Sequence, residues 1–147
     1  MAATADMTEM PWIRWLDLDT EFGSDGSFRV IQRRPKAEHL NHNGHVNAPV
    51  IYGVAEVAGA GAAVIAAGVA GTGAYTVIKR AAIEYQRPAQ GGVTASAKVD
   101  SDLAAHLQAE LIAGRGCDVP VDVELRDSTA ATTGTCQFVV TLRRPRG

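Results

Sequence analysis

The feature that most constrains this chain is an apolar segment, residues 46–78, in which Glu56 is the only charged side chain. Its length would allow a membrane span, but alanine and glycine, which have little affinity for lipid, dominate it. A carboxylate at the centre of a bilayer would also cost about 2.5–3.5 kcal/mol. We therefore predict no membrane span but a buried helix enclosed by a curved sheet, because an exposed helix would carry a polar face.

The expected ends of this helix follow from capping residues. Asn47 is a favourable N-cap, and Pro49 is tolerated in a first turn. Gly71 and Gly73 favour termination, so the helix is expected from residue 48 to about residue 70. Each interior glycine costs about 1 kcal/mol of helix propensity relative to alanine. Close approach of neighbouring backbone must offset that cost.

Short extended runs flank this helix on both sides. Residues 12–21 and 27–34, joined by turn residues at 22–26, predict a β-hairpin, and the polar residues 35–47 predict a loop. Behind the helix, the pattern predicts strands at residues 75–87, 93–99, 119–125 and 133–143.

The order of these elements predicts one α+β domain over residues 1–147, with a helix on one face of an antiparallel sheet. Residues 1–10 are expected to be a loose lead-in. Two alternatives stay open for residues 103–112. Their composition favours a helix, whereas their place within an antiparallel meander favours a strand.

Charge and cysteine content exclude several classes of protein. The formal net charge of −2 provides no basic footprint for nucleic acid. The basic run at residues 143–146 is either a solvated end or a contact for ligand phosphates. The first residues lack a basic start followed by an apolar stretch, so we expect no signal peptide and a cytoplasmic protein. Cys117 and Cys136 are then expected to be reduced, small core residues.

Glu56 is the first candidate for chemistry. A lone carboxylate inside an apolar helix pays a desolvation penalty unless it has a partner. Such a setting suits a general base. The alternative is a structural ion pair with an arginine at a helix end or a subunit interface.

The polar loop Asn41-His42-Asn43-Gly44-His45-Val46-Asn47 is the second candidate. It places amide and imidazole groups beside a helix N-terminus, where backbone N–H groups carry partial positive charge. A thioester oxygen needs such donors as it becomes an oxyanion. The alternative is a polar capping loop.

Other site types are disfavoured. The spacing of His39, His42 and His45 is compatible with a metal site, but no nearby cysteine or carboxylate completes a ligand set. We expect no metal and no cofactor. The sequence also lacks a serine-hydrolase elbow and a glycine-rich phosphate loop between a strand and a helix.

Residues 41–59, NHNGHVNAPVIYGVAEVAG, resemble hotdog-fold thioesterases, in particular the bacterial branch related to phenylacetate-pathway and 4-hydroxybenzoyl-CoA thioesterases. Those proteins carry an Asn or Gln in the loop, a small residue at the helix start and an acidic residue further along the helix. Residues 82–91, AIEYQRPAQG, are similar to their long strand. The resemblance spans residues 38–142 and implies a hotdog fold, an antiparallel sheet wrapped around one long helix.

This resemblance implies hydrolysis of an acyl-CoA or acyl-carrier thioester. Glu56 matches the catalytic carboxylate, as base for water or as nucleophile. Ala48 matches the residue whose backbone N–H polarises the thioester carbonyl, and Asn41 matches the loop amide that places water or substrate. Relatives of this kind also pair two protomers edge to edge, so we expect a homodimer or homotetramer in which Glu56 faces residues 75–85 of the partner.

Two departures from the family pattern concern the donors. Many relatives have His-Gly-Gly where this chain has Asn47-Ala48-Pro49. Because Pro49 has no N–H, only Ala48 or Val50 could donate to the carbonyl. Ile78 stands where some relatives place a Ser or Thr on the strand opposite the helix.

The remaining expected contacts follow from the same matched segments. The substrate-binding residues are expected to be His42, His45, Asn47, Tyr52 and Arg87. Candidates for the CoA phosphates are Arg87, Arg115 and Arg143. Two alternative functions stay open: a hotdog dehydratase or hydratase that uses His39, His42 or His45, and a non-catalytic protein that binds an acyl ligand.

Overall fold

The computed structural model of this chain describes residues 7–145. In chain order, the elements are η1 (Met7–Glu9), α1 (Pro11–Leu16), β1 (Asp19–Phe22), β2 (Phe28–Gln32), η2 (Ala37–His39), α2 (Ala48–Ala67), η3 (Gly68–Gly71), β3 (Tyr75–Tyr85), β4 (Val93–Ala97), α3 (Ser101–Ile112), β5 (Cys117–Asp127) and β6 (Thr132–Arg143). Residues 1–6 of the predicted lead-in lie outside the described residues.

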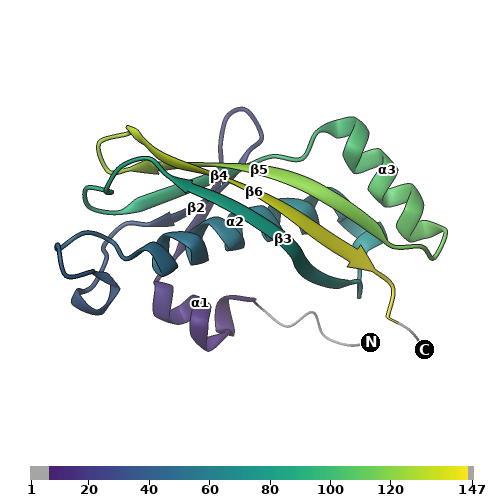
Figure 1. Cartoon of the computed structure of the whole chain (residues 1–147). Coiled ribbons are helices and arrows are strands. Elements are labelled where there is room, and N and C mark those ends of the chain that lie inside the picture. Colours follow the sequence, from purple (N-terminus) through teal and green to yellow (C-terminus); the bar gives the residue numbers. More distant parts are fainter. Residues whose placement is uncertain (1–6, 146–147) are drawn as a thin grey trace.

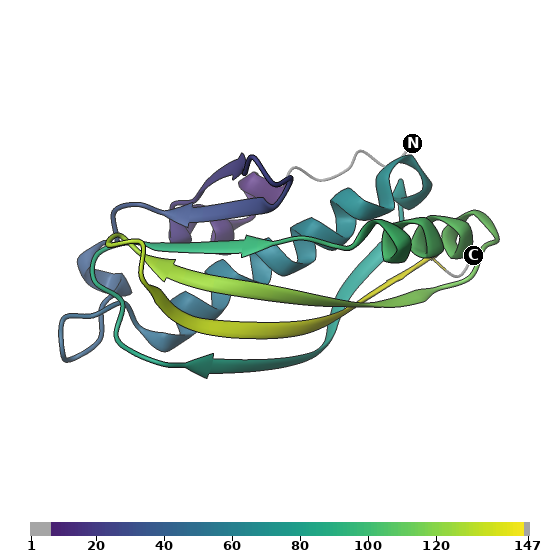
Figure 2. The ribbon, with the colours of Figure 1, turned by 90° about the horizontal axis from the view of Figure 1, so that it is seen from above.

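The strands form one six-stranded antiparallel sheet with the order β1-β2-β4-β5-β6-β3. The sheet curls around α2, and Figures 1 and 2 show the helix lying along its inner side. β3 is an edge strand that pairs only with β6. The predicted α+β hotdog fold, an antiparallel sheet wrapped around one long helix, is therefore confirmed.

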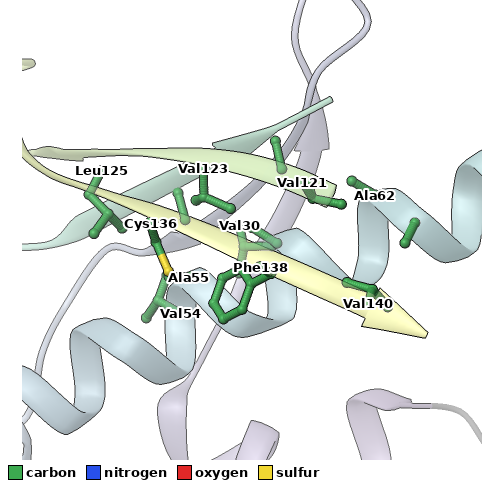
Figure 3. Close-up of a cluster of buried hydrophobic side chains, with 14 of the residues drawn as sticks. Val30, Val54, Ala55, Ala62, Val121, Val123, Leu125, Cys136, Phe138 and Val140 are labelled. Carbon is green, nitrogen blue, oxygen red and sulfur yellow. The ribbon is translucent and has the colours of Figure 1, made fainter. Parts of the chain in front are cut away.

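α2 is the central helix expected from the apolar segment, and η3 extends it to Gly71. The stretch Ala48–Gly71 is long and apolar enough to cross a membrane, but in this fold it packs against the sheet. Alternate residues of β5 and β6 point toward it (Figure 3), namely Val121, Val123, Leu125, Cys136, Phe138 and Val140. This period-two burial on one face explains why the strands alternate in sequence.

Neighbouring backbone was expected to approach the glycines of α2, but aromatic rings occupy that space instead. A methyl group added at Gly59 would lie 2.6 Å from the ring of Phe138. Gly61 is covered in the same way by Phe28, and Gly53 by Trp12. Ring contact therefore offsets the poor helix propensity of glycine.

The predicted first strand, residues 12–21, is wrong in its first half. Pro11 occupies the first turn of α1, a position that proline favours. Ile13 and Leu16, three residues apart, are both buried, which is the spacing of one helix face. Only Asp19–Phe22 forms β1, and its antiparallel pairing with β2 confirms the predicted hairpin.

Residues 103–112 belong to α3, so the strand expected from the meander is wrong and the composition was the better guide. Leu107 and Leu111 are buried one turn apart. Gln108 Nε2 donates a hydrogen bond to the Ala66 carbonyl at 2.8 Å. α3 therefore packs on the C-terminal part of α2, as Figure 2 shows. The other predicted strands are found, with ends shifted by up to two residues.

Candidate active site

The first turn of α2 presents one free backbone amide. Asn47 is the N-cap residue, but its side chain makes no capping hydrogen bond. Its carbonyl instead accepts from the N–H of Val50 at 2.9 Å and of Ile51 at 3.1 Å. Pro49 has no N–H, and the N–H of Ala48 has no partner among residues 7–145. Of the two donors that the sequence left open, Val50 is therefore used within the helix and Ala48 is available.

The loop before α2 is held by the side chain of Asn41. Its Oδ1 accepts from the backbone N–H of Asn43 at 2.9 Å and of His45 at 3.2 Å. The Asn41 N–H donates to the His45 carbonyl at 2.8 Å, and Gly44 adopts a positive φ of 76° that closes the turn. The Asn41 oxygen is thus engaged in shaping the loop. His42 is exposed, whereas His45 is half-buried beside the helix start.

His39 is a structural residue. Its ring is 0% exposed, Nδ1 accepts from the Lys36 N–H at 2.9 Å and Nε2 lies 2.8 Å from the Trp15 carbonyl. This arrangement requires the hydrogen to be on Nε2. The His39 carbonyl accepts from the Asn47 N–H at 2.8 Å and so supports the helix start. His39 therefore cannot provide the free base that a dehydratase would need.

The described residues contain no grouping of three or more His, Cys, Asp or Glu side chains that could hold a metal ion. Within the loop, the two ring nitrogens of His39 are already engaged with the backbone. The three-histidine spacing in the sequence is thus not a spatial cluster.

Glu56 lies on α2 two turns after the helix start and is half-buried. Burial raises the pKa of Tyr52, and the nearby Glu56 carboxylate raises it further. Tyr52 is fixed by an edge contact between its ring and Phe138, with ring centroids 5.7 Å apart. The structure therefore brings together Glu56 and Tyr52, two of the predicted site residues, one helical turn apart.

Cys136 on β6 faces the same part of α2 (Figure 3). Burial raises the pKa of its thiol to about 11, and the nearby Glu56 carboxylate contributes to the shift. A thiol with that pKa stays protonated near neutral pH and is a poor nucleophile. Both cysteines are free; Cys136 is the core residue expected, while Cys117 is only half-buried.

Tyr85, the last residue of β3, reaches the start of the same helix. Its hydroxyl donates to the backbone carbonyl of Ala48 at 3.0 Å. Burial raises the pKa of Tyr85, with a smaller effect from Cys136, so the hydroxyl remains a donor near neutral pH. The sequence analysis did not single out this residue, because a contact between residues so far apart in the chain has no local signal.

The arginines expected at CoA phosphates all have protein partners. Arg87 donates to the Thr132 carbonyl at 3.1 Å and lies 3.4 Å from the buried carboxylate of Asp127. Arg115 forms a bidentate ion pair with Glu110, with N–O distances of 2.8 and 2.9 Å. Such partners orient the guanidinium groups.

The basic run at residues 143–146 is not simply a solvated end. Arg143 lies over the ring of Tyr75, with its guanidinium carbon 5.2 Å from the ring centroid. Arg144 donates to the carbonyls of Thr72 at 2.6 Å and Ala70 at 2.7 Å, just beyond the C-terminus of α2. Arginine at that place complements the helix dipole. Residue 146 lies outside the described residues.

Two hollows, of about 710 and 680 Å³, lie on the outer side of the sheet. The first is lined mainly by β2, β4 and β5, and the second by β3, β5 and β6. Neither is lined by Ala48, Tyr52 or Glu56. Ala48 and Glu56, which the sequence assigned to catalysis, therefore lie on α2 outside both hollows.

Comparisons with known proteins agree with this fold. The family "Domain of unknown function (DUF4442)" matches residues 24–142, and no curated protein matches the sequence. The structure is similar to a candidate thioesterase from Shewanella oneidensis (TM-score 0.78, 19% identity, covering 94% of this chain and 91% of that one). It is also similar to a thioesterase from Haemophilus influenzae (TM-score 0.71, 13% identity, covering 93% of this chain and 85% of that one). A third protein of similar fold, from Bacillus halodurans, was crystallised with CoA (TM-score 0.67, 14% identity, covering 89% of this chain and 77% of that one). The resemblance seen in the sequence is thus confirmed at the level of the fold.

Proposed function

This chain belongs to the DUF4442 family, and from that premise we propose that it hydrolyses an acyl-CoA or acyl-carrier thioester with Glu56 as the central carboxylate. Two proteins of similar fold are named as a thioesterase or a candidate thioesterase, and a third was crystallised with CoA. The observation that carries the proposal is the first turn of α2, where the Ala48 N–H is left free at the positive end of a helix.

The free N–H of Ala48 suits a developing oxyanion. An oxyanion donor must lie about 2.7–3.1 Å from the oxygen and need no rearrangement during the reaction. The Asn47 carbonyl, which accepts twice within the helix, fixes the peptide group that carries this N–H. A thioester carbonyl placed there is polarised by a rigid donor and by the helix dipole.

The carboxylate that acts on this carbonyl comes from a second copy of the chain. Ala48 and Glu56 are eight residues apart, a separation of about 12 Å along a helix axis. A reacting atom must approach to about 3–3.5 Å, so Glu56 of the same chain is too far along the helix even with one bridging water. A two-fold pair of antiparallel α2 helices brings Glu56 of one chain to Ala48 of the other.

The free edge of β3 is the surface for such a pair. A long edge strand is a template for pairing with another chain, and β3 (Tyr75–Tyr85) pairs on one side only. Two β3 strands joined edge to edge would continue the sheet and leave both α2 helices on one face. The position of Glu56 on α2, outside the hollows of the single chain, fits a cleft that only the dimer encloses.

In the reaction, Glu56 removes a proton from water as the water oxygen attacks the thioester carbon, or its carboxylate attacks that carbon directly. The carbonyl oxygen becomes an oxyanion held by the Ala48 N–H. In either route the C–S bond then breaks, and the thiolate leaves and takes up a proton. Attack by water gives the carboxylic acid directly, whereas direct attack leaves an anhydride between the acyl group and Glu56, which a water molecule then hydrolyses to the carboxylic acid and free Glu56. The neighbouring Tyr52 hydroxyl, whose pKa the Glu56 carboxylate raises, is a donor that orients this carboxylate.

The predicted substrate contacts come from segments on either side of α2 in the sequence. His42, His45 and Asn47 come from the loop that precedes α2, and Arg87 follows the end of β3. These groups lie where the pantetheine arm and the phosphates of CoA would leave the cleft. Arg87 is oriented by Asp127 and keeps part of its guanidinium exposed for a phosphate.

Free-thiol release from short, aromatic and long acyl-CoAs tests the proposal. We expect one acyl class to be cleaved by the purified protein. Hydration of an enoyl-CoA without thiol release would favour a hydratase. Saturable binding of an acyl-CoA with no turnover of any thioester would favour a ligand-binding protein.

A further inference from the structure

The contact between Tyr85 and Ala48 joins the end of the edge strand to the start of the central helix. Among residues 7–145, the bond from the Tyr85 hydroxyl to the Ala48 carbonyl is the only hydrogen bond between β3 and α2. Tyr85 is 45% exposed, so the bond lies near the mouth of the candidate site and not in the core.

Other bonds at the helix start do not replace this contact. The Asn47 carbonyl fixes the direction of the Ala48 N–H relative to the helix, and the His39 carbonyl holds the preceding loop through the Asn47 N–H. Neither bond reaches the sheet edge. Of the hydrogen bonds at the helix start within residues 7–145, that of the Tyr85 hydroxyl is the one that ties the first turn of α2 to β3.

The strand pairing gives the Tyr85 ring freedom to make this contact. Its partner on β6 is Gly134, which carries no side chain. Residues directly opposite on antiparallel strands normally pack their side chains against each other. With glycine opposite, the tyrosine ring has no cross-strand side chain to hold it and is free to lean toward α2.

We propose that Tyr85 is a positioning residue for catalysis: its hydroxyl holds the first turn of α2 so that the Ala48 N–H is aimed at the thioester carbonyl. This inference rests on the proposed thioesterase function. Tyr85 contacts neither the carbonyl nor Glu56 and acts through Ala48. Loss of the hydroxyl lowers turnover without removing a group that binds substrate.

The test is steady-state kinetics of the full-length Tyr85→Phe variant on the best acyl-CoA found for the wild type. One lost hydrogen bond predicts a fall in kcat of roughly fivefold to twentyfold. KM changes less than about twofold, because transition-state and not ground-state contacts are lost. The pH profile of kcat/KM keeps its shape, since Glu56 is untouched. The matched control is Gln108→Met, which removes a side-chain hydrogen bond to the Ala66 carbonyl at the other end of α2, with kinetics like wild type.

A double-mutant cycle separates positioning from a general structural effect. Ala48→Pro removes the N–H that Tyr85 is said to aim. If Tyr85 acts through that N–H, Tyr85→Phe causes no further loss of kcat in the Ala48→Pro background. Independent, additive losses would overturn the inference, as would a Tyr85→Phe variant with wild-type kcat. A wild type that cleaves no thioester would overturn the proposed function together with the inference, whereas an active wild type with wild-type-like Tyr85→Phe overturns the inference alone.

Discussion

Tyr52 lies one helical turn before Glu56 on α2, with its hydroxyl beside the Glu56 carboxylate. Burial and the neighbouring carboxylate both raise the pKa of this tyrosine, so it stays a neutral donor near neutral pH. The pair joins the predicted catalytic carboxylate to a ring that is packed on Phe138. Tyr52 thus connects the chemistry of α2 to the packing of the sheet.

The Tyr52→Phe variant keeps the ring contact and loses the hydroxyl. Without a hydroxyl beside it the Glu56 carboxylate has more freedom, and we expect kcat to fall about threefold to tenfold. Stability changes by less than about 1 kcal/mol, because Tyr52 is only half-buried and the variant keeps the ring contact with Phe138. Kinetics on one acyl-CoA and a denaturation curve measure both effects. A variant with unchanged kcat would show that Tyr52 does not orient Glu56.

Ala48→Pro isolates the backbone donor. Proline is favoured in the first turn, and Asn47 already has φ −65° and ψ 140°, a conformation suited to the residue before proline. The variant therefore folds with its helix intact but without the N–H, and kcat falls about 100-fold or more, as for the loss of an oxyanion donor. Circular dichroism checks the fold. The control is Ala48→Gly, which keeps the N–H; equal activity of the two variants would exclude Ala48 as the donor.

Mixed dimers test whether one site uses two chains. Purified heterodimers of a Glu56→Gln chain and an Ala48→Pro chain contain one site with both groups intact, so about half of the wild-type activity is expected. Each variant homodimer alone is nearly inactive. The reciprocal control pairs a wild-type chain with a chain carrying both changes and is expected to be inactive. Activity in the control and none in the first heterodimer would place the site within one chain.

Cys136 predicts a loss of stability at alkaline pH. An unfolded thiol has a pKa near 9.0, and the folded protein raises it to about 11. The contribution is complete below pH 9, because both states then bind the proton, and is lost as pH rises toward 11. Its full size is about 2–3 kcal/mol.

Chemical denaturation at pH 8 and at pH 11 measures this effect. The wild type is expected to lose more stability between the two pH values than Cys136→Ala does. Tyr52 and Tyr85, whose pKa values are also raised, are present in both proteins, and Cys136→Ala removes only the smaller effect that the thiol has on their pKa values. The same pH dependence in the variant would show that the thiol is not buried as described.

Local features of the sequence were sufficient to find the central helix and its neighbouring loop. The apolar segment around Glu56 has no polar face, and Asn47 and Gly71 lie at its ends. The hairpin and the later strands followed from alternation and turn residues. The loop and the carboxylate of Glu56 were named from the residues themselves, whereas the N–H of Ala48 was named from the resemblance to hotdog-fold thioesterases.

The errors and omissions have physical causes. Residues 12–16 read as extended because aromatic and β-branched residues favour strands, but Pro11 and the spacing of Ile13 and Leu16 favour a helix. For residues 103–112, a regular antiparallel meander predicted a strand, whereas the composition correctly favoured a helix. The contacts of Tyr85 with Ala48 and of Cys136 with Glu56 depend on the register of β3 and β6, which no local pattern encodes.

The most direct test of the account is thiol release by Glu56→Gln beside the wild type, with the acyl-CoA that the wild type cleaves best. The substitution keeps the size of the side chain and removes the carboxylate. If Glu56 is base or nucleophile, kcat falls about 100-fold or more while the fold and the oligomeric state stay unchanged. A well-folded variant with wild-type turnover would contradict the central claim and leave Glu56 as a structural residue of α2.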